Sequence, residues 1–339
     1  MPAKAFKLLI IILLPCFLRA QVGDSTYADR LGFPKGSRVL ILHVDDAGMS
    51  FDSNDGAELA LTKGVSTSVS VMMPCPWVPG FIAFLKKHPE IDAGIHLTLT
   101  SEWDSYRWGP VSIRKIGSGL IDSCGYLWPS VAEVVKHASA DEIEMEMKAQ
   151  LEKARSMGFN PTHLDTHMGT VFGSPEFITR YIGLGLKYNI PVMLPGGNDE
   201  LIKAEAMLPD ATIVELRLLG RQLWYAGLPV LDDLHNYSYD WVIPADIASD
   251  DKKLNDFKTK KYIEAIKSLK PGLTMMIMHC TNTSPEFKYI SNSGPTRKGD
   301  LLAMMNPKFR EALAQEGIIL TTWREVKRRR DKIIPYFIQ

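Results

Sequence analysis

Short apolar runs rich in β-branched residues alternate along the chain with longer amphipathic stretches. The short runs have the length and composition of buried strands, whereas the longer stretches repeat with the period of a helix. Eight such strand-like runs are predicted: 38–44, 67–73, 93–99, 162–165, 191–194, 241–243, 273–278 and 318–321.

Helices are predicted between many of these strands. The clearest begins at Ser139, where Ser139 and Glu142 form a capping-box pattern, and ends at Gly158, a residue that commonly follows a helix. Four other helices are predicted at 79–87, 175–188, 262–270 and 306–315.

Strands that alternate with helices indicate a parallel α/β sheet. For a chain of 339 residues the pattern favours a distorted (β/α) barrel of about seven or eight mostly parallel strands. A doubly wound open sheet is the structural alternative. Segments 101–130 and 199–240 are longer than ordinary connections, so we expect long insertions that serve as lids or binding loops.

The N-terminus has the layout of a secretory signal peptide. Lys4 and Lys7 precede an apolar run at 8–18, and a polar sequence begins after Ala20. A membrane-spanning helix needs about 20 apolar residues, so this run is too short to span a bilayer. We therefore expect a signal peptide at 1–20, a single domain at 21–339, no integral membrane segment, and a secreted or periplasmic protein.

Composition narrows the function classes. The 39 basic and 39 acidic residues balance, which argues against a nucleic-acid partner because phosphate binding needs a basic face. The three cysteines beyond residue 20 have neither metal-type spacing nor an even number, so no disulfide framework is predicted. The sequence leaves open whether the chain forms a homo-oligomer.

Five of the eight histidines, together with three aspartates, lie at or beside predicted strands. The carboxyl ends of parallel strands share one face of a barrel, so these side chains should converge there. The set is His43, Asp45, Asp46, His96, His163, Asp165, His167 and His279. The other three histidines, His88, His137 and His235, lie in predicted surface segments, and we expect them to be solvated.

Neutral imidazoles and carboxylates are suitable ligands for a divalent cation, and a catalytic site needs about three of them. Asp46, His96 and His167 could bind one zinc, magnesium, cobalt or nickel ion, with zinc as the first choice. Such an ion lowers the pKa of a bound water to about 7. Asp45 is then the candidate general base and His279 the candidate general acid for a departing amine. The set indicates hydrolysis.

Other members of the set would support the ligands. Residues at 163, 165 and 167 alternate along a strand, so all three could line the site. Asp165 is suited to accept an imidazole N–H from a metal-bound histidine. We place His43 and His163 with it, behind the ligands.

Four motifs resemble those of the YdjC-like carbohydrate deacetylases, a group that includes chitooligosaccharide deacetylases. They are Leu-His-Val-Asp-Asp-Ala-Gly at 42–48, Ala-Gly-Ile-His-Leu-Thr-Leu-Thr at 93–100, Pro-Thr-His-Leu-Asp-Thr-His at 161–167 and Met-His-Cys at 278–280. The turn at 64–68 is also similar to theirs. The resemblance spans most of the mature chain.

The resemblance implies a distorted barrel and a metal-dependent removal of acetyl from N-acetylated, N-acetylglucosamine-type sugars by a metal-bound water. The family's metal ligands fall on Asp46, His96 and His167, its base falls on Asp45, and its late-strand histidine falls on His279. The chain departs from the family pattern at His43, Ala47, Met168-Gly169 and Cys280, where the family usually has Asn, Phe, further histidines and Pro.

An N-acetylated oligosaccharide substrate would rest on aromatic rings. Trp103, seven residues after His96 in the first long segment, is the preferred platform. Two alternatives stay open: hydrolysis of another amide or ester at the same ion, and a noncatalytic glycan-binding protein on the same scaffold.

Overall fold

The computed structural model describes residues 25–112 and 117–333. The predicted signal peptide at 1–20 lies outside these described residues. None of the helices within the described ranges combines the length and apolar character needed to cross a membrane.

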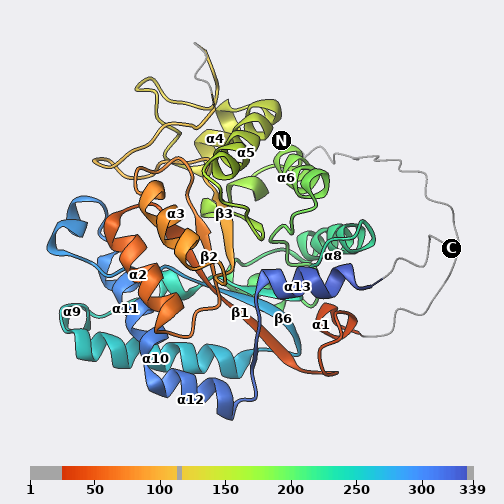
Figure 1. Cartoon of the computed structure of the whole chain (residues 1–339), viewed down its shortest axis with the longest axis vertical. Helices are drawn as coiled ribbons and strands as arrows, with labels where there is room; N and C mark the ends of the chain where they lie inside the picture. The colour runs from red at the N-terminus through yellow and green to blue at the C-terminus, as the bar shows by residue number, and fades with distance from the viewer. Residues whose placement is uncertain (1–24, 113–116, 334–339) are drawn as a thin grey trace, which may run out of the picture.

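Seven strands form one sheet in which every pairing is parallel (Figure 1). The order is β4-β3-β2-β1-β6-β5, with β7 paired to β1. The strands are β1 Arg38–Ala47, β2 Ser68–Val71, β3 Ala93–Leu97, β4 Leu164–Thr166, β5 Asp233–His235, β6 Gly272–Met278 and β7 Ile319–Leu320.

The sheet curls so that its two outer strands approach each other. Leu164 of β4 forms an isolated parallel bridge with Val192, and Pro195 forms another with Leu231, just before β5. The segment 192–195 therefore links β4 to β5 and completes a distorted barrel, as the sequence predicts, in place of the doubly wound alternative. The predicted strand at 191–194 contributes these isolated bridges but no regular strand.

The predicted strand at 241–243 is wrong. This segment follows the short 3-10 helix η2 Ser238–Asp240 and has no strand pairing. Val242 is 87% exposed, and the Trp241 ring packs against Tyr262 with a centroid distance of 4.8 Å. Trp241 thus anchors this segment against the helix that contains Tyr262, and the segment does not belong to the sheet. β6 pairs with β1 on one side, and the strand on its other side is β5, a few residues before this segment.

Helices surround the sheet (Figure 1). The predicted helix from Ser139 is α5, and its capping box forms: Glu142 N donates to Ser139 Oγ at 3.3 Å and Ser139 N donates to Glu142 Oε2 at 2.9 Å. The helices are α1 Tyr27–Arg30, α2 Phe51–Thr62, α3 Val78–Lys87, α4 Val131–His137, α5 Ala140–Ser156, α6 Pro175–Tyr188, α7 Glu200–Glu205, α8 Asp210–Tyr225, α9 Ala245–Ala248, α10 Asp251–Ser268, α11 Gly294–Met305, α12 Pro307–Gln315 and α13 Trp323–Asp331, with 3-10 helices η1 His167–Phe172, η2 and η3 Pro285–Tyr289.

Two expectations about helices need correction. The predicted helix at 262–270 is only the last part of α10, which begins at Asp251, because Asp250 caps its first turn through Lys252 N and Lys253 N. The segment at 199–240, which we expected to be a long insertion that serves as a lid or binding loop, contains α7, α8 and the sheet strand β5.

Candidate active site

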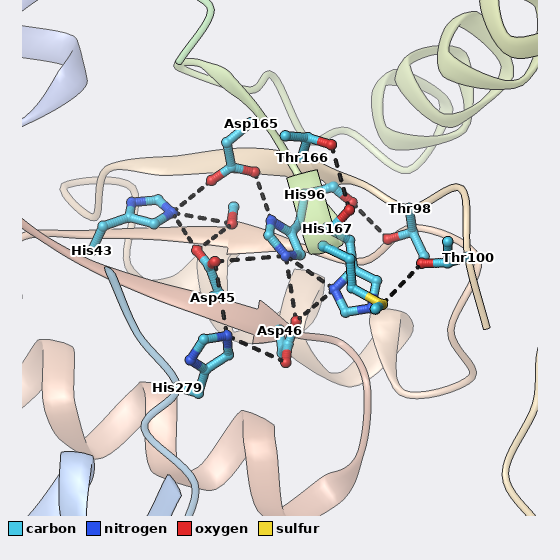
Figure 2. Close-up of polar contacts among 12 residues, drawn as sticks. His43, Asp45, Asp46, His96, Thr98, Thr100, Asp165, Thr166, His167 and His279 are labelled. Carbon is cyan, nitrogen blue, oxygen red and sulfur yellow. Dashed lines mark hydrogen bonds and ion pairs between the residues drawn. The ribbon is translucent and has the colours of Figure 1, made fainter. Parts of the chain in front are cut away.

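The carboxyl ends of four strands bring the predicted side chains together at one end of the barrel (Figure 2). Asp45 and Asp46 come from β1, His96 from β3, His167 from the start of η1 directly after β4, and His279 from the residue after β6. The convergence expected from the sequence is therefore present.

A bulge at the end of β1 lets both adjacent aspartates reach the site. Neighbouring residues of a regular strand point to opposite faces of the sheet. Here the register of β1 against β2 shifts between Val44 and Ala47, and Asp46 has a left-handed backbone with φ of 67°. Such a bulge changes the direction of a side chain. Asp45 and Asp46 therefore lie on the same side, next to His96 and His279 (Figure 2).

Three ligand atoms form a compact triangle. Asp46 Oδ1 lies 3.4 Å from His96 Nε2 and 3.3 Å from His167 Nδ1, and the two nitrogens are 3.3 Å apart. Ligands about 2.0–2.1 Å from a tetrahedral cation are separated from one another by about 3.3–3.4 Å. Asp46 Oδ1 is buried and has no hydrogen-bond partner among the described residues. The three side chains therefore fit a divalent cation.

Asp46 is held in the ionised state that a ligand needs. Burial alone would raise the pKa of Asp46, but the Arg297 guanidinium and the neighbouring imidazoles hold it well below its usual range. Arg297 Nη1 donates to Asp46 Oδ2 at 2.7 Å. This bond occupies one carboxylate oxygen and leaves Oδ1 facing the two histidines.

Asp165 lies behind His96. Asp165 Oδ1 is 2.8 Å from His96 Nδ1, and Asp165 Oδ2 is 2.8 Å from His43 Nε2. A proton on His96 Nδ1 directed at this carboxylate leaves the Nε2 lone pair available to a cation. Burial alone would lower the pKa of His43, but hydrogen bonds to Asp165 and Asp45 raise it to about 9.

His167 is oriented by a carboxylate that the sequence analysis did not single out. His167 Nε2 lies 3.1 Å from both oxygens of Glu102, so its Nδ1 faces Asp46. The backbone turns sharply behind it, with left-handed φ values of 53° at Met168 and 65° at Gly169. This turn ends the extended path of β4 and places the His167 ring beside His96, with the ring centroids 5.2 Å apart.

The two carboxylate oxygens of Asp45 have different surroundings. Oδ1 lies 3.2 Å from His43 Nε2 and accepts from Ser70 Oγ at 3.5 Å. Oδ2 lies 3.7 Å from His96 Nε2 and 4.0 Å from His279 Nε2. One oxygen thus anchors the side chain, while the other faces the site.

His279 lies across the site from the ligand histidines. Its Nε2 is 4.0 Å from both Asp45 Oδ2 and Asp46 Oδ2. Burial lowers the pKa of His279 against the opposing effect of the Asp46 charge. The Tyr239 ring contacts the imidazole edge to face, with a centroid distance of 4.9 Å.

The remaining predicted site residues lie further from the ligand atoms. His163 is fully buried, stacks on Trp323 and approaches the His43 ring, and burial lowers its pKa to about 4. Trp103 is half-buried near the site, since the Arg297 guanidinium lies 5.7 Å from its ring centroid.

The expectation that His235 is solvated is wrong. His235 ends β5, is 5% exposed and pairs through Nδ1 with Glu205 Oε1. His137 stacks on Trp128 at a centroid distance of 4.3 Å, while His88 lies near the surface beside Glu90.

Comparison with known proteins identifies the family. The model of the family described as YdjC-like protein matches residues 39–315, which include all four strand ends of the site. The chain belongs to the YdjC-like family.

Proteins from several bacterial species are similar in sequence to this YdjC-like chain. A protein named carbohydrate deacetylase from Thermus thermophilus is 33% identical over 299 residues, covering 88% of this chain and 97% of the relative. A second protein of that name, from Thermoanaerobacter pseudethanolicus, is 23% identical and covers 86% of this chain and 100% of the relative.

A solved structure has the same fold. A protein from Enterococcus faecalis V583, described as a candidate cellobiose-phosphate cleavage protein, aligns with a TM-score of 0.68 and 18% identity. The alignment covers 86% of this chain and 99% of the other.

The sequence did not point to two side chains that contact the candidate ligands, Glu102 beside His167 and Arg297 beside Asp46. Glu102 is adjacent to Trp103, so its position just after β3 could have drawn attention to it. Arg297 lies in the helical segment α11, 251 residues from its partner Asp46. Arg297 is only 2% exposed in the folded chain, and arginine is almost never fully buried unless it has a charged partner. The sequence alone does not reveal this burial.

Proposed function

We propose that this chain is a metal-dependent carbohydrate N-deacetylase that releases acetate from N-acetylated sugars. The observation that carries the proposal is the buried triangle of Asp46 Oδ1, His96 Nε2 and His167 Nδ1. The relatives named carbohydrate deacetylase support the substrate class, and one of them matches over 97% of its own length. A further relative from Yersinia enterocolitica, 29% identical over 134 residues, is named chitooligosaccharide deacetylase.

The triangle would bind one divalent cation. Such a cation supplies Lewis-acid chemistry, because it polarises a substrate carbonyl and acidifies water. Zinc is our first choice, since its usual ligand distances match the observed separations. Asp165 and Glu102 hold the outer nitrogens of the two ligand histidines and so keep both rings in place.

Asp45 is the proposed general base. Its Oδ1 is anchored by His43 and Ser70, so Oδ2 is the oxygen able to take a proton from water in the site. His279 is the proposed general acid, because Nε2 faces the same space from the other side and could donate a proton to the departing sugar amine.

The substrate is proposed to be an N-acetylated oligosaccharide whose sugar rests on Trp103. This ring lies beside Arg297, which itself contacts Asp46, so a sugar on Trp103 would lie next to the ligand triangle. We further propose that the protein is secreted or periplasmic, on the basis of the basic and apolar sequence pattern of residues 4–18.

The test is acetate release from N-acetylglucosamine oligomers by the purified chain. We expect release in the presence of added zinc, magnesium, cobalt or nickel, loss after thorough chelation, and recovery when one ion is restored. Asp45→Asn should lower turnover by about 100- to 10,000-fold, the usual contribution of a general base. Asp141→Asn is the control, since its carboxylate is 83% exposed. Acetate release that continues after chelation would refute the proposed metal role. Faster hydrolysis of acylated amino acids than of N-acetylglucosamine oligomers would refute the proposed substrate class.

A further inference from the structure

A buried polar network contacts the backbone of His279. Its centre is the ion pair between Lys258 of α10 and Asp300 of α11, whose Nζ and Oδ1 are 2.8 Å apart. Both side chains are fully buried. An ion pair of this kind is weak evidence for stability, because removing two charges from water costs about as much as their attraction returns. Its position therefore needs another explanation.

The second carboxylate oxygen of Asp300 contacts the active site. Asp300 Oδ2 accepts a hydrogen bond from the backbone N–H of His279 at 2.9 Å. Asp300 Oδ1 accepts from both Lys258 Nζ and Tyr262 Oη, the latter at 2.7 Å. With both Oδ1 donors in place, the carboxylate has a fixed orientation, and Oδ2 points at the residue directly after β6.

Lys258 also stabilises the segment that carries Tyr239, whose ring contacts the imidazole of His279. Its Nζ donates to the Ser238 carbonyl and to Thr296 Oγ1, both at 2.8 Å, so all three ammonium protons are used. Ser238 in turn donates through Oγ to the Ile277 carbonyl at 2.7 Å. The next residue in η2 is Tyr239, whose ring contacts the imidazole of His279.

The same helix reaches the ligand triangle. Arg297 and Asp300 are three residues apart on α11 and therefore lie on one helix face. Arg297 holds Asp46 Oδ2, while Asp300 holds the backbone of His279. The α11 helix thus sets the distance between a proposed metal ligand and the proposed acid.

We propose that Asp300, oriented by Lys258 and Tyr262, is a positioning residue that holds His279 at its place in the active site. The expected effect on kcat rests on the proposed function, whereas the expected effect on the position of His279 does not. A displacement of about 1 Å of a catalytic group can lower the rate by about 100-fold. Loss of this hydrogen bond should therefore lower kcat and leave substrate binding nearly unchanged.

The test compares two variants that differ only in the acceptor for the His279 N–H. Both carry Lys258→Met, so that no unpaired charge is left. Both keep Tyr262, whose hydroxyl can accept from an amide NH₂ and so direct the asparagine oxygen toward the His279 N–H. One adds Asp300→Asn, which keeps a carbonyl oxygen, and the other adds Asp300→Leu, which has the same branching and no acceptor. We expect the leucine variant to have a kcat about 10–100-fold below that of the asparagine variant. KM should agree within about twofold. Equal kcat values in two folded variants would overturn the proposal.

A spectroscopic measurement makes the test independent of activity. In protein labelled with ¹³C and ¹⁵N histidine, the imidazole resonances of His279, assigned by their loss in His279→Gln, should shift or broaden in the leucine variant relative to the asparagine variant, since both share the Lys258→Met background. In the wild type, the His279 amide should exchange with solvent as slowly as the amides of β6. Rapid exchange would refute the hydrogen bond even if the variants fail to fold. If the wild type shows these signatures but releases no acetate, the proposed function fails and the positioning role stands.

Discussion

Replacing Asp165 by asparagine should weaken metal binding through a residue that does not itself bind the metal. The Asp165 carboxylate serves two imidazoles, His96 Nδ1 and His43 Nε2, each at 2.8 Å. Asparagine has the same shape but only one acceptor oxygen, and its NH₂ group can only donate. In Asp165→Asn, one of the two rings must therefore face a donor.

The size of the effect follows from which ring loses its acceptor. If the NH₂ group faces His96, the imidazole proton moves from Nδ1 to Nε2, the atom that lies 3.4 Å from Asp46 Oδ1 and would bind the cation. If it faces His43, that ring can no longer donate through Nε2 to Asp45. Loss of such a supporting carboxylate weakens metal affinity by about 10–100-fold. This change corresponds to about 1.4–2.7 kcal/mol of binding free energy.

The assay is calorimetric titration of metal-depleted protein with zinc and, separately, with cobalt, whose absorption spectrum reports the ligand set. Asp92→Asn is the matched control, since Asp92 is equally buried and accepts from Ser68 Oγ at 2.7 Å and Trp323 N at 3.0 Å, at the other end of β3. We expect Asp92→Asn to keep the wild-type metal affinity. Equal affinities in Asp165→Asn and the wild type would refute the supporting role of Asp165.

Three other predictions follow from single side chains. Glu102→Gln removes the charge that faces His167 Nε2, so zinc affinity should fall by about 10-fold in the same titration, and an unchanged affinity would contradict this account. Gly94→Ala places a methyl group 2.5 Å from the ring of His163, so denaturant unfolding should show a loss of about 1–3 kcal/mol, and wild-type stability would show that the His163 ring can move aside at no cost. Burial raises the pKa of Asp199 to about 7, above its unfolded value near 3.8, so ionisation opposes folding and stability is lost as pH rises through this range. Asp199→Asn, which tolerates the left-handed φ of 55° there, should therefore add about 2–4 kcal/mol at pH 8 and little at pH 4, and an equal gain at both would refute the titration.

The strands with the strongest sequence signal are longer runs with apolar residues at most positions. All the residues of β3 and β6 are buried, and their nearly continuous apolar runs are visible without a structure. β5 has no such signal, because Asp233 and His235 flank a single leucine. The polar residues have local tasks: Asp233 accepts from Leu201 N at 2.8 Å at the start of α7, and His235 pairs with Glu205. Three-residue strands of this kind cannot be separated from loops by periodicity.

The site was predictable as far as it depends on strand ends. The convergence of Asp46, His96 and His167 could be predicted because the carboxyl ends of parallel strands lie at the same end of a barrel. The side chains that orient these ligands come from an insertion and from a helix, and their pairing depends on contacts between distant segments. Glu102 is 65 residues from His167, and Arg297 is 251 residues from Asp46. No local pattern in the sequence reports such pairs.

The backbone at Asp46 shows how such a distant contact can override a local preference. Strict alternation along β1 would direct Asp45 and Asp46 to opposite faces, and only the left-handed φ of 67° at Asp46 brings both to the site. A left-handed residue costs roughly 1–2 kcal/mol, and less for aspartate than for most side chains. Arg297 Nη1 donates to Asp46 Oδ2 at 2.7 Å, and without this contact the buried Asp46 carboxylate would lose its guanidinium partner. Removing one partner of a buried ion pair costs about 3–5 kcal/mol, which exceeds the local strain. The geometry of the ligand triangle therefore depends on Arg297, which is 251 residues from Asp46 in sequence.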